Sequence, residues 1–170
     1  MVDMDLIILG SLIANPSHGY QLKQHIESTF GNRYFKLSNS ALYPRLSKLE
    51  QDGFIEGKRE PQDKMPDRIV YYITEAGMGR LRGLVATPPG PREDQFDFMI
   101  RATFFGLISK DERLKVAMPE YEAKCCELKE ALEKREKYGK YMDKFSLLAL
   151  DAGIDMIRLT ISYYEKLMET

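Results

Sequence analysis

Residues 37–74, LSNSALYPRLSKLEQDGFIEGKREPQDKMPDRIVYYIT, change their hydrophobic periodicity midway, and this change decides the fold. In the first half Leu42, Leu46 and Leu49 recur at intervals of four and three, which predicts a helix with one apolar face. We expect the helix to end near Gly53, because glycine suits a left-handed cap. The opposite face is polar. It carries Ser38, Asn39, Ser40, Tyr43, Arg45 and Lys48.

The second half has the alternation of a β-hairpin. Ile69, Tyr71 and Ile73 fall on one face of the last strand, and the residues between them fall on the other. Residues 54–55 are a shorter β-prone run, and residues 60–67 contain two prolines and three acidic residues, which predicts a solvated hairpin tip. The hairpin also carries basic side chains. These are Lys58, Arg59, Lys64 and Arg68.

Two further helices are expected before this stretch. Residues 4–14 are apolar around most of a helix circumference, which predicts a helix buried on more than one side. Pro16 ends it, and residues 19–29 form a second amphipathic helix. Ser38 or Ser40 can cap the third helix. Three short helices followed by a hairpin predict a winged helix-turn-helix over residues 1–87, a shape that reads DNA.

The remainder is expected to be helical, so the fold class is mostly α with a small β-hairpin. Residues 88–94 form a proline-rich linker, and residues 95–170 form a C-terminal helical, coiled-coil-like dimerisation domain. Apolar residues recur at alternating intervals of three and four along the last helix, as in a coiled-coil seam. They are Leu147, Leu150, Ile154, Ile157, Ile161, Tyr164 and Met168. An antiparallel hairpin within one chain would produce the same pattern, but additional apolar residues such as Phe145 and Leu148 favour contact between two chains.

Charge and composition limit the possible functions. Residues up to Arg92 include 12 basic and 10 acidic side chains, whereas the rest of the chain has 13 basic and 16 acidic ones. DNA affinity depends on phosphate neutralisation, so a chain this weakly basic needs a dimer to bind tightly. No membrane span or signal peptide is expected, which indicates a cytoplasmic protein. Adjacent Cys125 and Cys126 cannot form an ordinary bridge, and no metal site, cofactor motif or catalytic motif is present, which argues against an enzyme.

Three separated motifs resemble the amino-terminal domain of the PadR family of transcriptional regulators. They run from Leu9-Gly10 to His18-Gly19-Tyr20-Gln21-Leu22, from Leu42-Tyr43-Pro44-Arg45-Leu46 to Gly53, and from Val70-Tyr71 to Gly77. The resemblance implies a repressor that binds an inverted-repeat operator in double-stranded DNA as a homodimer. It also implies release by a small-molecule effector or a stress signal whose identity is unknown. The long second half resembles the larger members of the family.

The expected mechanism assigns roles to both polar surfaces. Ser38, Asn39, Ser40 and Tyr43 enter the major groove, while Arg45, Lys48, Lys58, Arg59, Lys64 and Arg68 neutralise the flanking phosphates. His18 is expected to be a turn residue with local hydrogen bonds rather than a ligand. Residues such as Phe96, Met99, Phe104, Phe105 and Met142 either line an effector pocket or form core. The alternative function is a winged-helix module that binds protein rather than DNA, which the weak charge asymmetry and the acidic hairpin tip favour.

Overall fold

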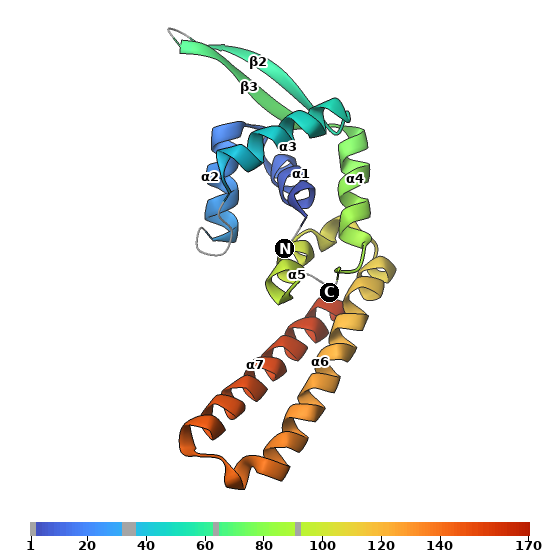
Figure 1. The fold of residues 1–170 in the computed structure, drawn as a ribbon. Coiled ribbons are helices and arrows are strands. Elements are labelled where there is room, and N and C mark those ends of the chain that lie inside the picture. The colour runs from blue at the N-terminus through green and yellow to red at the C-terminus, as the bar shows by residue number, and fades with distance from the viewer. Residues whose placement is uncertain (1–2, 32–36, 63–64, 91–92) are drawn as a thin grey trace. The chain divides into compact units, whose positions relative to one another are not determined.

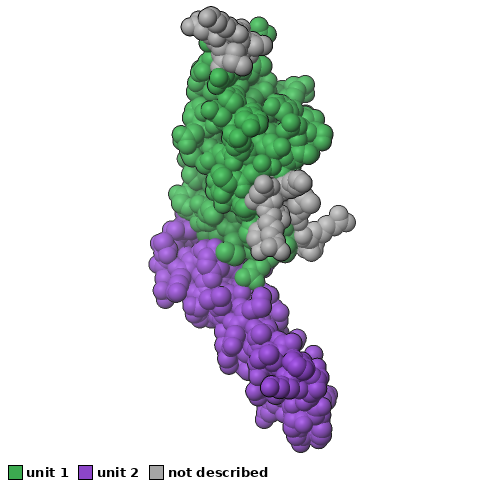
Figure 2. All heavy atoms as spheres, turned by 90° about the vertical axis from the view of Figure 1, so that its left-hand side faces the viewer, with its two compact units in different colours: residues 1–108 green, residues 109–170 purple. Residues whose placement is uncertain are grey.

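The computed structural model describes residues 3–31, 37–62, 65–90 and 93–170. Contacts divide the chain into two compact units, residues 1–108 and residues 109–170 (Figure 2). Most of the described residues are helical, and the strands form one small antiparallel sheet. The expected fold class is therefore confirmed. Within the described residues, no helix is both long and apolar enough to cross a membrane.

Unit 1 is built around its first helix. The helices α1 (Met4–Ala14), α2 (Gly19–Phe30) and α3 (Asn39–Gln51) come first in the chain (Figure 1). Leu6, Ile7, Ile8 and Leu9 are completely buried, because α1 packs against α2 and α3 and also against the later helix α4 (Glu75–Ala86). The predicted burial of α1 on more than one side is confirmed.

The sheet has three strands, one more than the hairpin predicted. Its order is β1 (Ser17–His18), β3 (Met65–Ile73) and β2 (Ile55–Gln62), all antiparallel (Figure 1). The two residues of β1 are too few to show a periodicity, which is why the sequence did not predict this strand.

The strands of the hairpin also run into residues 60–67, so the prediction that this whole segment is a tip was wrong. β2 is an outer strand, and its pairing with β3 is irregular between Glu60 and Gln62. Pro61 lies at that irregularity, a place where a strand tolerates a residue without an N–H group. Prolines therefore do not mark the end of this strand.

A tight contact fixes the wing to α4. The Thr74 side chain caps α4 by accepting from the Gly77 backbone N–H at 3.1 Å, and its hydroxyl donates to the Gly53 carbonyl at 2.7 Å. A Cβ atom on Gly77 would lie only 2.0 Å from the Phe54 carbonyl oxygen. Glycine is therefore required at position 77 because the backbone of the hairpin approaches the helix at this point.

The segment after α4 is tied back to unit 1. Helix α5 (Gln95–Ala102) is followed by the short η1 (Phe105–Leu107). The buried Arg101 donates to the carbonyls of Leu84 and Thr87 and forms an ion pair with Glu93 at 2.6 Å, so it bridges both sides of the proline-rich segment. The Phe104 ring occupies the space that a Cβ on Gly10 would need.

These contacts place α5 and η1 in unit 1. We expected the helical domain to begin at residue 95, but the compact units divide between residues 108 and 109. The bridge made by Arg101 gives the physical reason, because a proline-rich segment clamped on both sides does not separate two packed bodies. The assignment of DNA binding to residues 1–87 and dimerisation to residues 95–170 stays a prediction.

Unit 2 is a hairpin of two long helices. It consists of α6 (Lys110–Tyr138), the short η2 (Gly139–Tyr141) and α7 (Lys144–Glu169), and the two long helices lie side by side (Figure 1). Ser109 and Glu112 form a capping box at the start of α6. Arg135 of α6 donates to both carboxylate oxygens of Asp151 on α7, one of them at 3.1 Å.

The apolar residues of α7 form two different surfaces. The seven predicted dimerisation residues are buried or half-buried within the single chain, with Ile154 and Tyr164 the most buried. Burial raises the pKa of Tyr164 to about 12, and the charge of Glu120 adds to the effect. Another set of α7 side chains is 64% to 79% exposed. It comprises Phe145, Leu148, Met156 and Leu159.

Candidate nucleic-acid interface

The front of α3 keeps its polar groups exposed. Leu42, Leu46 and Leu49 are buried, so the first-turn polar side chains lie on the outer side of the helix, where the Asn39 Oδ1 accepts from Lys23 at 3.3 Å. Ser38 is the N-cap, and its Oγ accepts from the Ala41 N–H at 3.1 Å and lies 2.9 Å from the Ser40 Oγ. Ser38, Asn39, Ser40 and Tyr43 are all exposed, as a surface that meets a duplex requires.

Tyr43 is partly supported by the neighbouring helix. Its side chain is 46% exposed, and a Cβ on Gly19 would lie 2.7 Å from the Tyr43 Cε1 atom. The ring therefore rests on the backbone at the start of α2, which restricts its position without burying it. A restrained aromatic side chain loses less conformational entropy when it makes a contact.

Arg45 is half-exposed and pairs with a buried carboxylate. Its guanidinium donates to both oxygens of the buried Asp5 of α1, and the Nη2–Oδ2 distance is 2.6 Å. The hydrogen bond to Asp5 raises the pKa of Arg45, although burial opposes the shift. Arg80 of α4 also lies 3.7 Å from Asp5. Arg45 thus joins α3 to α1, and its charge is already balanced by Asp5.

The other cations predicted to bind phosphate differ in whether an acidic side chain lies close to them. The Lys48 ammonium lies 2.8 Å from Asp52, one turn further along. Lys58 lies 3.5 Å from Glu56 and over the Tyr72 ring, with 5.1 Å to the centroid. Arg59 and Arg68 are exposed on the wing. Lys64 lies outside the described residues.

The strand register separates the wing cations. Lys58 pairs with Val70, whereas Arg59 pairs with Ile69. Neighbouring residues of a strand point to opposite faces, and residues two apart share a face. Lys58 and Arg68 therefore lie on one face of the wing and Arg59 on the other. One duplex cannot meet all three cations on a single flat face of the sheet.

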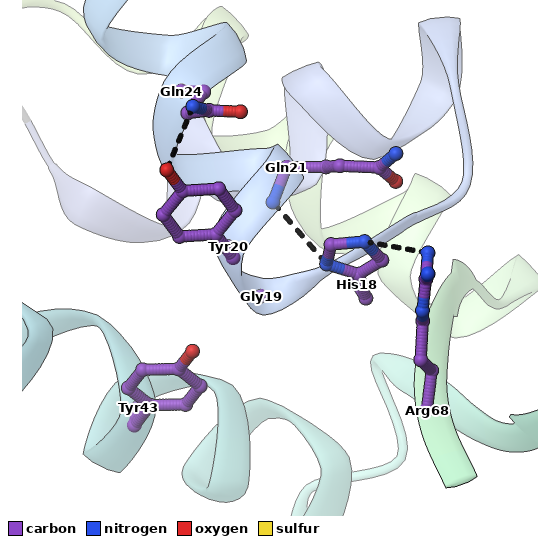
Figure 3. Close-up of a pocket in the computed structure, with 7 residues that line it drawn as sticks. All are labelled: His18, Gly19, Tyr20, Gln21, Gln24, Tyr43 and Arg68. Atoms are coloured by element: carbon purple, nitrogen blue, oxygen red, sulfur yellow. Dashed lines mark hydrogen bonds between the residues drawn. The ribbon is translucent and has the colours of Figure 1, made fainter. Parts of the chain in front are cut away.

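A cavity of about 500 Å³ opens where α2, α3 and β3 meet (Figure 3). It is lined by His18, Gly19, Tyr20, Gln21, Gln24, Tyr43 and Arg68. The His18 Nδ1 caps α2 by accepting from the Gln21 N–H at 3.3 Å, and the Arg68 Nη1 lies 3.4 Å from the His18 Nε2. Gln24 donates to the Tyr20 hydroxyl at 3.0 Å.

Sequence reasoning assigned only two of these residues, Tyr43 and Arg68, to the interface. His18 does make a local hydrogen bond, as predicted, but its ring also faces Arg68 across the chain. The sequence signal that could have identified the other lining residues was the run from His18 to Gln21. This run lies at the start of α2, the helix before α3. Among the described residues, no group of three metal-ligating side chains comes together.

The three-helix core, the exposed front of α3 and the antiparallel wing define a winged helix-turn-helix protein. Residues 8–83 match the family model described as "Transcriptional regulator PadR-like family". The chain therefore carries a PadR-like domain, and the resemblance inferred from the three motifs is confirmed.

Two curated relatives and one solved structure are similar to this chain. The negative transcriptional regulator PadR of Bacillus subtilis is 28% identical over 131 residues, which cover 75% of this chain and 71% of the relative. A probable transcriptional regulator of Mycobacterium tuberculosis is 27% identical over 84 residues, covering 49% of this chain and 44% of that protein. The crystal structure of Bacillus subtilis PadR in complex with operator DNA has 22% identity and a TM-score of 0.47, covering 98% and 96% of the two chains. Both curated relatives are named as regulators, so the prediction of a regulator rather than an enzyme is confirmed.

Proposed function

We propose that this chain is a homodimeric transcriptional repressor that binds an inverted-repeat operator through α3. The observation that carries the proposal is the division of α3 into two faces. Its leucines are buried, while Ser38, Asn39, Ser40 and Tyr43 are exposed at its N-terminal end. Hydroxyl and amide groups at the front of a recognition helix can hydrogen-bond to base edges and phosphates.

The dimer is supported by the exposed apolar surface of α7. Phe145, Leu148, Met156 and Leu159 recur at intervals of three, eight and three, so they follow one side of the helix. We therefore place the contact between chains on this stripe rather than on the predicted seam from Leu147 to Met168, which is largely covered within the chain. A dimer also doubles the positive surface offered to DNA, which a chain of net charge −1 needs.

Repression is supported by the Bacillus subtilis relative, which is named a negative transcriptional regulator. We place the protein in the cytoplasm with the DNA that it regulates.

Release by a small molecule or a stress signal is the remaining part of the proposal. Phe105 is buried and meets Phe98 edge-on with 6.0 Å between ring centroids, so these two rings serve the core rather than an effector pocket.

Binding to DNA from the region upstream of the protein's own gene tests the proposal. A labelled duplex of that region is titrated at several salt concentrations, with an unrelated duplex of equal length as the control. We expect a specific shift, and we expect log K to fall linearly with log salt by roughly 0.9 for each phosphate contact. An inverted repeat with half-sites about one helical turn apart should lie within the bound region.

The protein-binding alternative predicts a different result. If the wild-type protein produces no specific shift even at low salt, the exposed face of α3 does not read DNA. The acidic residues of the wing, Glu56 and Glu60 among them, would then be better explained as part of a protein contact.

A further inference from the structure

His18 is held between two hydrogen-bond donors. The Gln21 backbone N–H points at Nδ1 from 3.3 Å, and the Arg68 Nη1 lies 3.4 Å from Nε2 (Figure 3). A neutral imidazole has one nitrogen that accepts and one that donates, and arginine only donates. The tautomer whose Nδ1 accepts and caps α2 carries its proton on Nε2, and this is the tautomer that the cap selects. Nε2–H and Arg68 N–H are therefore two donors that face each other.

An oxygen placed between these two groups can accept from both, and the rest of the cavity provides more donors. The Tyr20 hydroxyl accepts from Gln24 at 3.0 Å, which leaves its own proton available to donate. The Tyr43 side chain lines the cavity from the side of α3 (Figure 3). None of the described residues that line the cavity is acidic. The described lining thus combines one permanent positive charge with neutral donors and includes no carboxylate that would repel an anion.

We propose that this cavity binds one phosphate of the DNA backbone, with oxygens that accept from His18 Nε2–H and from the Arg68 guanidinium. The proposal rests on the DNA-binding function proposed above and assigns it a phosphate site. Arginine binds phosphate strongly because its donors are charged and arranged in a fork. Tyr43 belongs to both the cavity and the exposed face of α3. A phosphate held here fixes the position of α3 relative to the bases.

Two substitutions and their matched controls test the site. Arg68→Gln removes the charge, and Arg82→Gln removes the same charge from an exposed position on α4. His18→Asn keeps an oxygen that can cap α2 but removes the Nε2–H group, and His25→Asn makes the same change further along α2. Binding of the labelled upstream duplex is measured against salt for all four variants, with a melting temperature for each.

We expect Arg68→Gln to weaken binding roughly tenfold and to reduce the slope of log K against log salt by about one, as the loss of one phosphate contact requires. His18→Asn should weaken binding roughly threefold to tenfold with little change in slope, since it removes a neutral donor. Arg82→Gln and His25→Asn should bind like the wild type.

The outcomes separate the two proposals. If Arg68→Gln and His18→Asn bind like their controls while the wild type binds DNA with a steep salt dependence, the phosphate site is wrong and the proposed function stands. If the wild type binds no DNA, both fail. Titration of the free protein with inorganic phosphate distinguishes the source of the anion. Tight binding of inorganic phosphate that does not compete with DNA would assign the cavity to a soluble anion and overturn the proposal.

Discussion

Single residues show how much of this surface depends on contacts between distant parts of the sequence. Asp5 and Arg45 are 40 positions apart, yet they form the ion pair that holds α3 against α1. Gly19 leaves room for the Tyr43 ring, and Gly77 leaves room for the Phe54 carbonyl. The sequence identified Arg45 as one basic residue on a polar face. It could not show that a buried carboxylate lies within reach of that residue.

Glycine at position 77 gives a prediction with an internal control. Gly77→Ala forces a methyl group against the Phe54 carbonyl, so it should lower the free energy of unfolding by roughly 1–3 kcal/mol or more. Gly79→Ala changes the same helix where a Cβ meets nothing within 4 Å, and alanine should stabilise it by about 0.5–1 kcal/mol. Thermal and denaturant unfolding measure both. Equal effects of the two substitutions would show that the Phe54 carbonyl does not crowd position 77.

The ion pair of Arg45 predicts a loss of stability. Among the described residues, Arg45→Met leaves the buried Asp5 with only Arg80 at 3.7 Å. Because the Arg45 side chain is 40% exposed, the change should cost roughly 1.5–3 kcal/mol, less than the loss of a fully buried pair. Lys48→Met removes an exposed pair with Asp52 on the same helix and should cost less than about 1 kcal/mol. Denaturant unfolding of both variants provides the test. If Arg45→Met proved as mild as Lys48→Met, Arg45 would be free to contact phosphate.

At the scale of secondary structure, the sequence predicted the long elements better than the short ones. The helices were found because leucine, isoleucine and valine recur at helical spacing. Ser38 was one of two residues expected to cap the third helix, and its side chain does cap α3. The strand β1 was missed because two residues carry no period, and the hairpin strands extend beyond the point where proline was expected to end them.

The start of α7 predicts a pH dependence. The Asp143 carboxylate accepts from the Ser146 hydroxyl and from the N–H groups of Ser146 and Phe145, and these hydrogen bonds lower its pKa below the ordinary 3.8. A group whose pKa is lower in the folded state stabilises the fold above its ordinary pKa. That contribution disappears as the pH falls through the lowered value. The α6–α7 hairpin should therefore lose stability below pH 3.8.

Asp143→Asn isolates this contribution. Asparagine keeps a capping oxygen but does not titrate in this range, so the variant should lose less stability than the wild type as the pH falls below 3.8. Asp155→Asn, on the same helix but away from its N-terminus, is the control. Helical circular dichroism during thermal melting at several acidic pH values provides the measurement. Parallel pH profiles for the wild type and Asp143→Asn would rule out a stabilising cap.

At the scale of the whole molecule, the sequence predicted two functions for two parts of the chain. The periodicity of α7 was read as a seam between two chains, and the structure shows that one hairpin covers most of it. Periodicity reports that a face is apolar but does not identify what lies against it. The sequence set Phe145 and Leu148 apart from the seam, but only the packing of α6 against α7 shows that the seam is largely covered while these two residues stay exposed.

The second face of α7 predicts the oligomeric state. Leu148→Glu combined with Leu159→Glu places charges on the exposed stripe, so the variant should sediment as a monomer at concentrations where the wild type is a dimer. Its affinity for the upstream duplex should fall at least about tenfold, because one chain makes half of the phosphate contacts. Lys129→Glu combined with Lys134→Glu is the control on α6. A double leucine variant that still sediments as a dimer would place the contact elsewhere.

Tyr43→Ala tests whether the exposed front of α3 reads DNA, as proposed. Tyr138→Ala is the matched control, because the two tyrosines are each 46% exposed and Tyr138 lies on α6. Affinity for the upstream duplex and melting temperature are measured for both variants. We predict that Tyr43→Ala loses about 1–3 kcal/mol of binding free energy while its melting temperature stays close to that of Tyr138→Ala. Unchanged DNA binding would show that Tyr43 does not contact DNA, and a collapse of stability would place its ring in the core.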